Sequence, residues 1–172
     1  MRYRLTRAAD LAEASYAGKS HEIISFQWKD SLDKEDVQAH LLTDNTLLIT
    51  GSNSIMDYIR YNLRVRNLGD PNLSLKTVPG VSWHQGFMAH ARVVHNWLVE
   101  KGYTPSFVIG HSLGAASAQI LSAAYNVPAI GFAAPRPCRT GSAMSAARRC
   151  LLVNRTDDKV CRLVSGFKHM GK

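Results

Sequence analysis

The sequence predicts an α/β fold with a mostly parallel central sheet, an antiparallel hairpin near the N-terminus and helices on both faces. Runs of apolar, β-branched residues alternate with segments whose apolar residues recur at helical spacing, which is typical of parallel strands joined by crossover helices. The extended runs 37–43 and 46–50 are joined by Asp44-Asn45, a turn signal that favours a hairpin. A chain of 172 residues with no visible repeat or linker is expected to form one domain, 1–172.

The N-terminal half is expected to contribute helices around the hairpin. Residues 5–17 place apolar side chains at helical spacing, and Gly18 ends that helix. Residues 21–28 are rich in β-formers, whereas the polar run 31–36 predicts a connection. A second helical pattern covers 56–63, after the hairpin.

The C-terminal half predicts the core of the parallel sheet. The strongest amphipathic helix opens at 83–87. A strand at 106–109 leads into a helix over about 113–125, whose small residues allow it to lie close to a sheet. Two more buried strands are expected at 127–134 and 151–153.

Composition and charge describe an ordinary globular protein with a positive excess. Apolar residues make up 45% and charged residues 20% of the chain, and the formal net charge is +8. This dispersed excess is compatible with plain solubility, and it would also draw the protein to anionic membrane surfaces. No nucleic-acid partner is expected, because the sequence lacks both a recognisable motif and a basic stripe interleaved with aromatic residues.

Cysteine usage and the N-terminus bear on cellular location. Cys138, Cys150 and Cys161 are odd in number, have no metal-type pairing and are expected to be reduced. No apolar core of signal-peptide length follows the basic N-terminus, and no window approaches the roughly 18 apolar residues of a membrane span. These features predict a cytoplasmic protein, or export by a route that the sequence does not reveal.

The motif Gly110-x-Ser112-x-Gly114 lies between the predicted strand and the helix of small residues. This order is that of a nucleophile elbow, with the serine at the tip of a sharp turn. Glycines are needed on both sides because strand and helix atoms approach too closely for a Cβ. A plain glycine turn is the alternative interpretation.

A serine nucleophile needs a histidine to take its proton and a carboxylate to orient that histidine. In hydrolases built on such an elbow, these partners follow the serine in the order Asp, then His. After Ser112 the chain contains two acidic residues, Asp157 and Asp158, and one histidine, His169. Spacing alone does not choose between the aspartates, and His111 is expected to support the turn.

Acyl transfer also needs two backbone donors for the developing oxyanion. One is the N–H of Leu113, directly after the nucleophile, and the other should come from the loop after an early strand, where Gly51-Ser52 lies. The Ser52 hydroxyl would add a third bond, unless it is an ordinary turn serine.

No metal or organic cofactor is predicted. His84, His90 and His95 are separated by six and five positions, not the four that align ligands on one helix face.

With these motifs the chain resembles the class 3 lipases, an α/β-hydrolase family that includes fungal triacylglycerol lipases. The similarity spans about residues 37–171, and its segments follow the family order. They are Thr50-Gly51-Ser52 with Asp57-Tyr58-Ile59, His84-Gln85-Gly86-Phe87, Gly110-His111-Ser112-Leu113-Gly114-Ala115, Phe132-Ala133-Ala134-Pro135-Arg136, Asn154 through Val160, and Phe167-Lys168-His169-Met170-Gly171.

The resemblance implies a Ser-His-Asp hydrolase with a covalent acyl-enzyme. Ser112 would attack, His169 would move the proton, and the family register selects Asp158 to hold the imidazole. Leu113 and Ser52 would stabilise the oxyanion.

Two positions depart from the family pattern: Thr50 stands where arginine is usual, and Cys161 where proline is usual. Only residues 64–82 are long enough to form a lid. The sequence therefore predicts an ester hydrolase, a lipase or esterase for acyl esters of lipids or small acyl esters. The alternatives are a phospholipase acting on anionic lipid and a non-catalytic binding module on a hydrolase scaffold.

Overall fold

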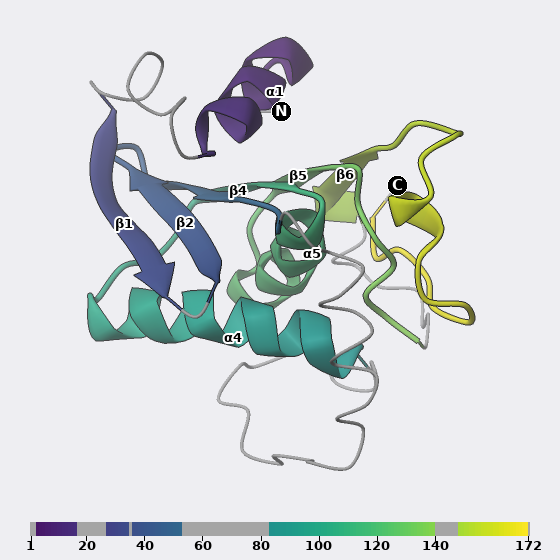
Figure 1. Ribbon diagram of the computed structural model, residues 1–172. Coiled ribbons are helices and arrows are strands. Elements are labelled where there is room, and N and C mark those ends of the chain that lie inside the picture. Colours follow the sequence, from purple (N-terminus) through teal and green to yellow (C-terminus); the bar gives the residue numbers. More distant parts are fainter. Residues whose placement is uncertain (1–2, 17–26, 35, 53–82, 140–147, 172) are drawn as a thin grey trace.

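The computed structural model describes residues 3–16, 27–34, 36–52, 83–139 and 148–171 (Figure 1). They form one mixed sheet of six strands with helices on both faces. The strands are β1 (Trp28–Lys34), β2 (Val37–Leu42), β3 (Thr46–Ile49), β4 (Phe107–His111), β5 (Ala129–Phe132) and β6 (Cys150–Val153).

The strands lie in the sheet in the order in which they occur in the chain. The β1–β2 and β2–β3 pairs are antiparallel, whereas β3 to β6 are parallel to one another. The predicted fold class, a mostly parallel sheet with an antiparallel N-terminal hairpin, is confirmed.

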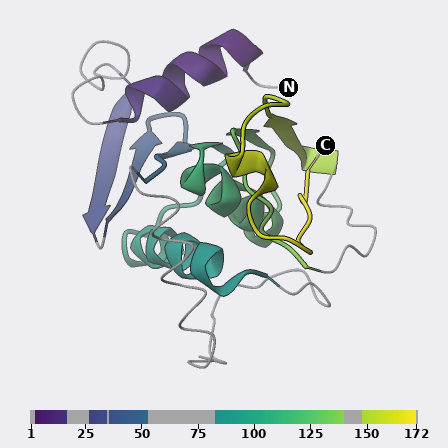
Figure 2. The same ribbon diagram turned by 45° about the vertical axis from the view of Figure 1, so that its right-hand side comes forward.

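The helices cover opposite faces of the sheet. Helix α1 (Leu5–Ala14) lies on one face, and α4 (Gln85–Glu100) and α5 (Leu113–Tyr125) lie on the other (Figures 1 and 2). The sheet has a hydrophobic core on each face. Alternate residues of a strand contribute to the two cores, because successive side chains of a strand point to opposite faces. Leu48 and Ile109 thus pack with α1, whereas Val108 packs with α4 and α5.

One segment differs from the sequence prediction. Residues 31–36 were expected to be a connection, but Ser31 to Lys34 belong to β1. This strand lies at the edge of the sheet and buries only Leu32, so its sequence shows no clear apolar alternation. Pairing with β2, rather than burial, makes it a strand. The predicted helix 56–63 and the segment 64–82 lie outside the described residues.

The parallel strands bring their carboxyl ends to the same edge of the sheet, where α/β proteins gather functional groups. Ser112 follows β4 there, Gly51 and Ser52 follow β3, and Ala133 follows β5. Within the described ranges, no helix combines the length and apolar character needed to cross a bilayer.

Candidate active site

Ser112 lies at the tip of the turn between β4 and α5. Its backbone angles are φ 53° and ψ −122°, a left-handed region that costs free energy for a residue with a side chain. Its N–H donates to the Phe132 carbonyl at 2.9 Å, and its own carbonyl accepts the Ala115 N–H at 2.9 Å. These bonds to β5 and to the first turn of α5 hold the serine in the strained conformation of a nucleophile elbow.

Two glycines make this turn possible. A Cβ on Gly110 would lie 2.3 Å from the Gly114 carbonyl oxygen, and a Cβ on Gly114 would lie 2.2 Å from the Ile49 carbonyl oxygen. Both obstacles are backbone atoms, which cannot move aside alone. The helix therefore crosses β3 and β4 at a distance that only glycine permits.

The close approach predicts the effect of Gly114→Ala. The new methyl group would push α5 away from the end of β3, so we expect the free energy of unfolding to fall by about 2–4 kcal/mol. Urea unfolding followed by circular dichroism measures the loss.

Gly102→Ala is the matched control for that variant. Gly102 also has a positive φ, 67°, but a Cβ there would meet nothing within 4 Å. Only the left-handed conformation is penalised, which costs about 1–2 kcal/mol. If Gly114→Ala were no less stable than Gly102→Ala, the close packing of helix on strand would be wrong.

The loop after β3 lies directly against Ser112. A Cβ on Gly51 would lie 2.7 Å from Ser112 Cβ and 2.6 Å from the Tyr16 hydroxyl oxygen. Thr50 fixes the start of this loop, since both its N–H and its hydroxyl donate to the Gln38 carbonyl, at 3.1 and 2.9 Å. The half-buried Ser52 comes next. The backbone predicted to supply an oxyanion donor therefore runs beside the serine.

Tyr16 joins this loop to the elbow. Its hydroxyl accepts the Gly51 N–H at 2.9 Å and lies 2.5 Å from His111 Nδ1. The tautomer of the imidazole sets which of the two atoms donates in this bond. Burial lowers the pKa of His111 and favours the neutral ring, while the negative charge of Asp158 acts in the opposite direction. The ring of His111 thus supports the turn, as the sequence predicted.

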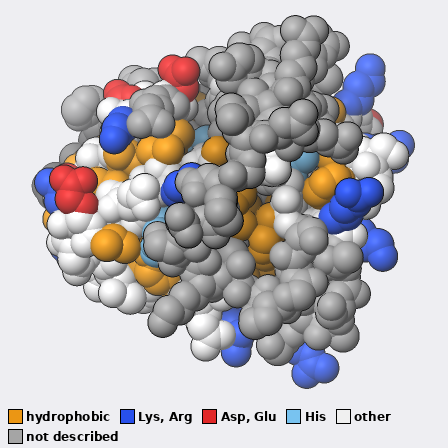
Figure 3. Space-filling view, turned by 90° about the horizontal axis from the view of Figure 1, so that it is seen from below, with side chains coloured by type: hydrophobic (Ala, Val, Ile, Leu, Met, Phe, Trp, Pro, Cys, Tyr) orange, Lys and Arg blue, Asp and Glu red, His pale blue; other side chains and the backbone are white. Residues whose placement is uncertain are grey.

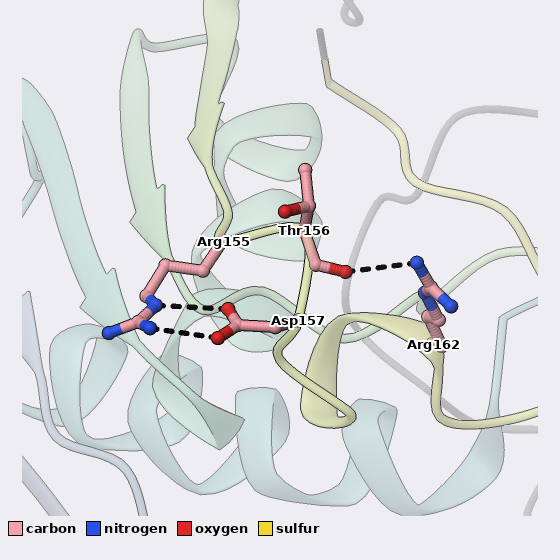
Figure 4. A network of polar contacts seen from close by, with 4 residues as sticks. All are labelled: Arg155, Thr156, Asp157 and Arg162. Carbon is pink, nitrogen blue, oxygen red and sulfur yellow. Dashed lines mark hydrogen bonds and ion pairs between the residues drawn. The ribbon is translucent and has the colours of Figure 1, made fainter.

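The two neighbouring aspartates lie in different surroundings. Asp157 accepts two hydrogen bonds from the Arg155 guanidinium, at 3.0 and 2.8 Å, and its side chain is 68% exposed (Figure 4). The bond to Arg155 lowers the pKa of Asp157. Arg162 closes the same loop by donating to the Thr156 carbonyl at 2.9 Å. Asp157 therefore faces solvent with its charge already paired.

Asp158 is partly buried. Its carboxylate accepts the Val160 N–H at 2.8 Å and the thiol of Cys161. Burial, together with this carboxylate, raises the pKa of Cys161 to about 11, so the thiol stays protonated. The charge of Asp158 also reaches His111. Of the two aspartates, Asp158 is the one whose charge raises the pKa of His111, the residue directly before Ser112.

The ring of His169 lies just beyond the end of β5. Its Nε2 lies 2.8 Å from the Ala134 carbonyl oxygen, which only accepts, so Nε2 carries a hydrogen. Burial lowers the pKa of His169, the Ala134 carbonyl raises it, and the positive charge of Arg136 lowers it further. Across the described residues, no hydrogen bond joins this ring to Ser112 or to Asp158. The imidazole is thus turned to a backbone carbonyl, and the lowered pKa favours its neutral form.

The backbone on both sides of His169 is anchored. Lys168 and Cys138 exchange backbone hydrogen bonds of 2.6 and 3.2 Å, and the Met170 N–H donates to Gln119 Oε1 at 2.9 Å. The side chain of Met170 is 1% exposed and belongs to the larger core. In Figure 2 this yellow segment runs beside α5. The backbone of this segment is therefore fixed on both sides of His169.

A small groove adjoins the elbow between α1 and the ends of β4 and β5. It encloses about 270 Å³ and is lined by Ala9, Ala12, Glu13, Tyr16, His111 and Phe132. Its walls are mostly apolar, and it reaches the residue directly before Ser112. In the part of the chain that the structure describes, no three His, Cys, Asp or Glu side chains come together as a metal site requires.

Two residues beside the site were not predicted from the sequence. The sequence pattern assigns Tyr16 only to the apolar face of the helix predicted over 5–17. Gln119 interrupts a run of small and apolar residues in 113–125, which was the available signal for a special role.

A strained serine between a parallel strand and a helix, at the carboxyl edge of a mixed sheet, is the arrangement of an α/β-hydrolase fold. The comparisons with solved structures agree with this assignment. The chain is similar to the Lip2 lipase of Yarrowia lipolytica, with 17% sequence identity and a TM-score of 0.65 over 95% of this chain and 76% of the lipase.

Two further fungal enzymes show the same likeness. A fungal lipase solved with an inhibitor, in work on interfacial activation, is 20% identical with a TM-score of 0.69, over 96% of this chain and 76% of that one. A triacylglycerol lipase from Penicillium expansum is 20% identical with a TM-score of 0.64, over 96% and 75%. No family model and no curated protein matches the sequence, so the similarity to these lipases is a similarity of fold.

Proposed function

We propose that this protein is a serine carboxylester hydrolase that cleaves acyl esters of lipids. The observation that carries the proposal is Ser112 at φ 53°, held in a nucleophile elbow against the backbone of Gly51. In the proposed reaction, Ser112 Oγ attacks the ester carbonyl carbon and His169 accepts its proton. The same histidine returns the proton to the leaving alcohol, and water then releases the acid from the acyl-enzyme.

The oxyanion of the tetrahedral intermediate would be stabilised by backbone donors. The N–H of Leu113 is suitable because the first N–H groups of a helix have no partner within that helix. Ser52, next to Gly51, would supply the second N–H and its hydroxyl.

His169 must leave the Ala134 carbonyl and turn toward Ser112 for the reaction. Catalytic hydrogen bonds are often absent before substrate binds and form in the reacting complex. The anchored backbone at Lys168 and Met170 supports a side-chain rotation, which is a small change. Asp158 would then orient the turned ring and stabilise its positive charge.

The mostly apolar groove beside His111 supports a substrate with an acyl chain. The three fungal lipases that are similar in fold support the same class of substrate. We therefore propose lipid or small acyl esters as substrates, with no cofactor.

A phospholipase acting on anionic lipid is the second candidate, and the distribution of charge favours it. Residues 1–100 contain 11 basic and 11 acidic residues, whereas 101–172 contain 10 basic and only 2 acidic ones. The whole excess of +8 therefore falls in the part of the chain that carries Ser112, Asp158 and His169. Figure 3, in which the C-terminal side stays on the right, shows lysine and arginine side chains gathered on that side.

A substrate panel tests the proposal. The wild type and Ser112→Ala are assayed on p-nitrophenyl esters of increasing chain length, on triglyceride, and on neutral and acidic phospholipid vesicles. We expect ester turnover by the wild type alone. Faster turnover on acidic vesicles than on triglyceride would select the phospholipase. A wild type that neither turns over any ester nor reacts with a fluorophosphonate would contradict the proposal.

A further inference from the structure

Gln119 has a long polar side chain that is fully buried, and it lies on α5, the helix that follows Ser112. It lies seven positions after Ser112 on α5 and is 0% exposed. A buried amide is costly unless its donors and acceptor are satisfied. Gln119 Nε2 donates to the Ala115 carbonyl at 3.2 Å and to the Pro135 carbonyl at 3.1 Å, while Oε1 accepts the Met170 N–H at 2.9 Å.

These partners belong to the two segments that meet at His169. Pro135 directly follows Ala134, whose carbonyl accepts the bond from His169 Nε2. Met170 directly follows His169 itself. One side chain thus binds the neighbour of the histidine and the neighbour of its acceptor, and it does so from the helix that carries Ser112.

We propose that Gln119 is a positioning residue that fixes the catalytic histidine relative to the nucleophile. This inference rests on the proposed function, in which His169 is the base. Because α5 starts at Ser112, the bonds from Gln119 tie the place of the imidazole to the place of the hydroxyl. They also keep the backbone still while the ring turns from Ala134 to the serine.

The chemistry of an amide explains why glutamine occupies this position. Pro135 presents its carbonyl to the side chain and Met170 presents its N–H, so the residue between them must both donate and accept. A glutamate carboxylate would keep the bond to Met170 and lose the one to Pro135. Methionine has a similar length and would lose both.

Replacing Gln119 is expected to disturb the alignment of His169 without unfolding the protein, because other contacts also hold this segment. The paired backbones of Cys138 and Lys168 hold the segment before His169 without help from Gln119. Met170 also keeps its contacts in the core. Removing the amide should therefore loosen the histidine while the sheet and α5 remain.

The test compares Gln119→Met and Gln119→Glu with Ser117→Ala. Ser117 is the matched control, because it is also 0% exposed on α5 but makes its hydrogen bond to His90 Nδ1 on α4, at 2.8 Å. Each protein is measured for kcat and KM on a p-nitrophenyl ester, for the rate of fluorophosphonate labelling, for Tm, and for hydrogen exchange at the Met170 amide.

For Gln119→Met we expect kcat to fall about 10- to 100-fold with KM changed less than about threefold, since misplacing a reacting group affects the transition state more than binding. Labelling should slow by a similar factor, and the Met170 amide should exchange faster. Gln119→Glu should fall between this variant and the wild type. Ser117→Ala should lower Tm but keep kcat within about threefold.

An active wild type together with an equally active, folded Gln119→Met would overturn the positioning role alone. The same holds if Ser117→Ala loses as much kcat as Gln119→Met, because the effect would then be one of stability. If Gln119→Met does not fold, Gln119→Glu decides, and wild-type kcat in that variant overturns the role. An unlabelled and inactive wild type would instead overturn the proposed function and this inference together.

Discussion

Replacing Ser112 with alanine is expected to lower ester turnover by about 10⁴- to 10⁶-fold and to leave the fold intact. The loss follows because no acyl-enzyme can form without the hydroxyl. The fold should survive because alanine keeps the Cβ, and because the bonds that hold the turn are made by the backbone of residue 112. Turnover of a p-nitrophenyl ester, fluorophosphonate labelling and circular dichroism measure the three quantities.

Ser122→Ala is the control for that change. Ser122 lies on the same helix and donates to the Val127 carbonyl at 2.6 Å, far along α5 from the elbow. It should stay active and labelled. Residual turnover above a few per cent in Ser112→Ala would show that another nucleophile operates. A wild type that binds an ester ligand without labelling would favour the binding module.

Replacing His169 with alanine is expected to be nearly as damaging, because members of a catalytic triad act as a unit. The serine would remain in place without a base, so both kcat and the labelling rate should fall by a factor of about 10³ or more. His95→Ala is the control, since its ring is bonded to the Tyr125 hydroxyl, at 2.8 Å, on the outer side of α4 and α5.

Comparing His111→Ala with His169→Ala tests which of the two histidines acts as the base. His111 lies next to Ser112 and is reached by the charge of Asp158. We expect a smaller loss for His111→Ala than for His169→Ala, because the ring of His111 is engaged by Tyr16. The reverse order of activities would assign the base to His111.

The pH dependence of kcat/KM should reflect the lowered pKa of His169. Burial and the charge of Arg136 both disfavour the protonated ring, while the Ala134 carbonyl favours it, and the pKa is lowered overall. A base must be neutral to accept a proton, so activity should fall only below the ordinary histidine pKa of about 6.5. Arg136→Ala should move this acid limb to higher pH. An unchanged limb in that variant would show that another group titrates.

The parts of the fold that the sequence predicted are those with a strong local pattern. The turn at Asp44-Asn45 and the two glycines around Ser112 encode their own geometry, and both lie where they were predicted. The strand at 31–34 was missed because it lies at the sheet edge and buries only Leu32, so its partner strand determines it.

Contacts between residues far apart in the chain limit how much of the candidate site can be predicted from the sequence. Tyr16 meets His111 across 95 positions, and Gln119 meets Met170 across 51, and no local pattern encodes either pair. Ser112, Asp158 and His169 could be proposed from the sequence because a serine hydrolase needs a hydroxyl, a carboxylate and an imidazole in that chain order, and they stay a prediction. The orientation of the His169 ring could not, because it depends on a backbone carbonyl supplied by a distant loop.

A sheet whose strands follow the chain order can be assembled as the polypeptide leaves the ribosome, each new strand docking on the one before it. The turn at Ser112, between β4 and α5, would then form before β5 and β6 join the sheet, and His169 follows β6 in the chain. A chain that assembles in this order buries the apolar residues of β3 and β4 before the segment that holds His169 against α5 is added, so under the proposed function the serine is placed before its base.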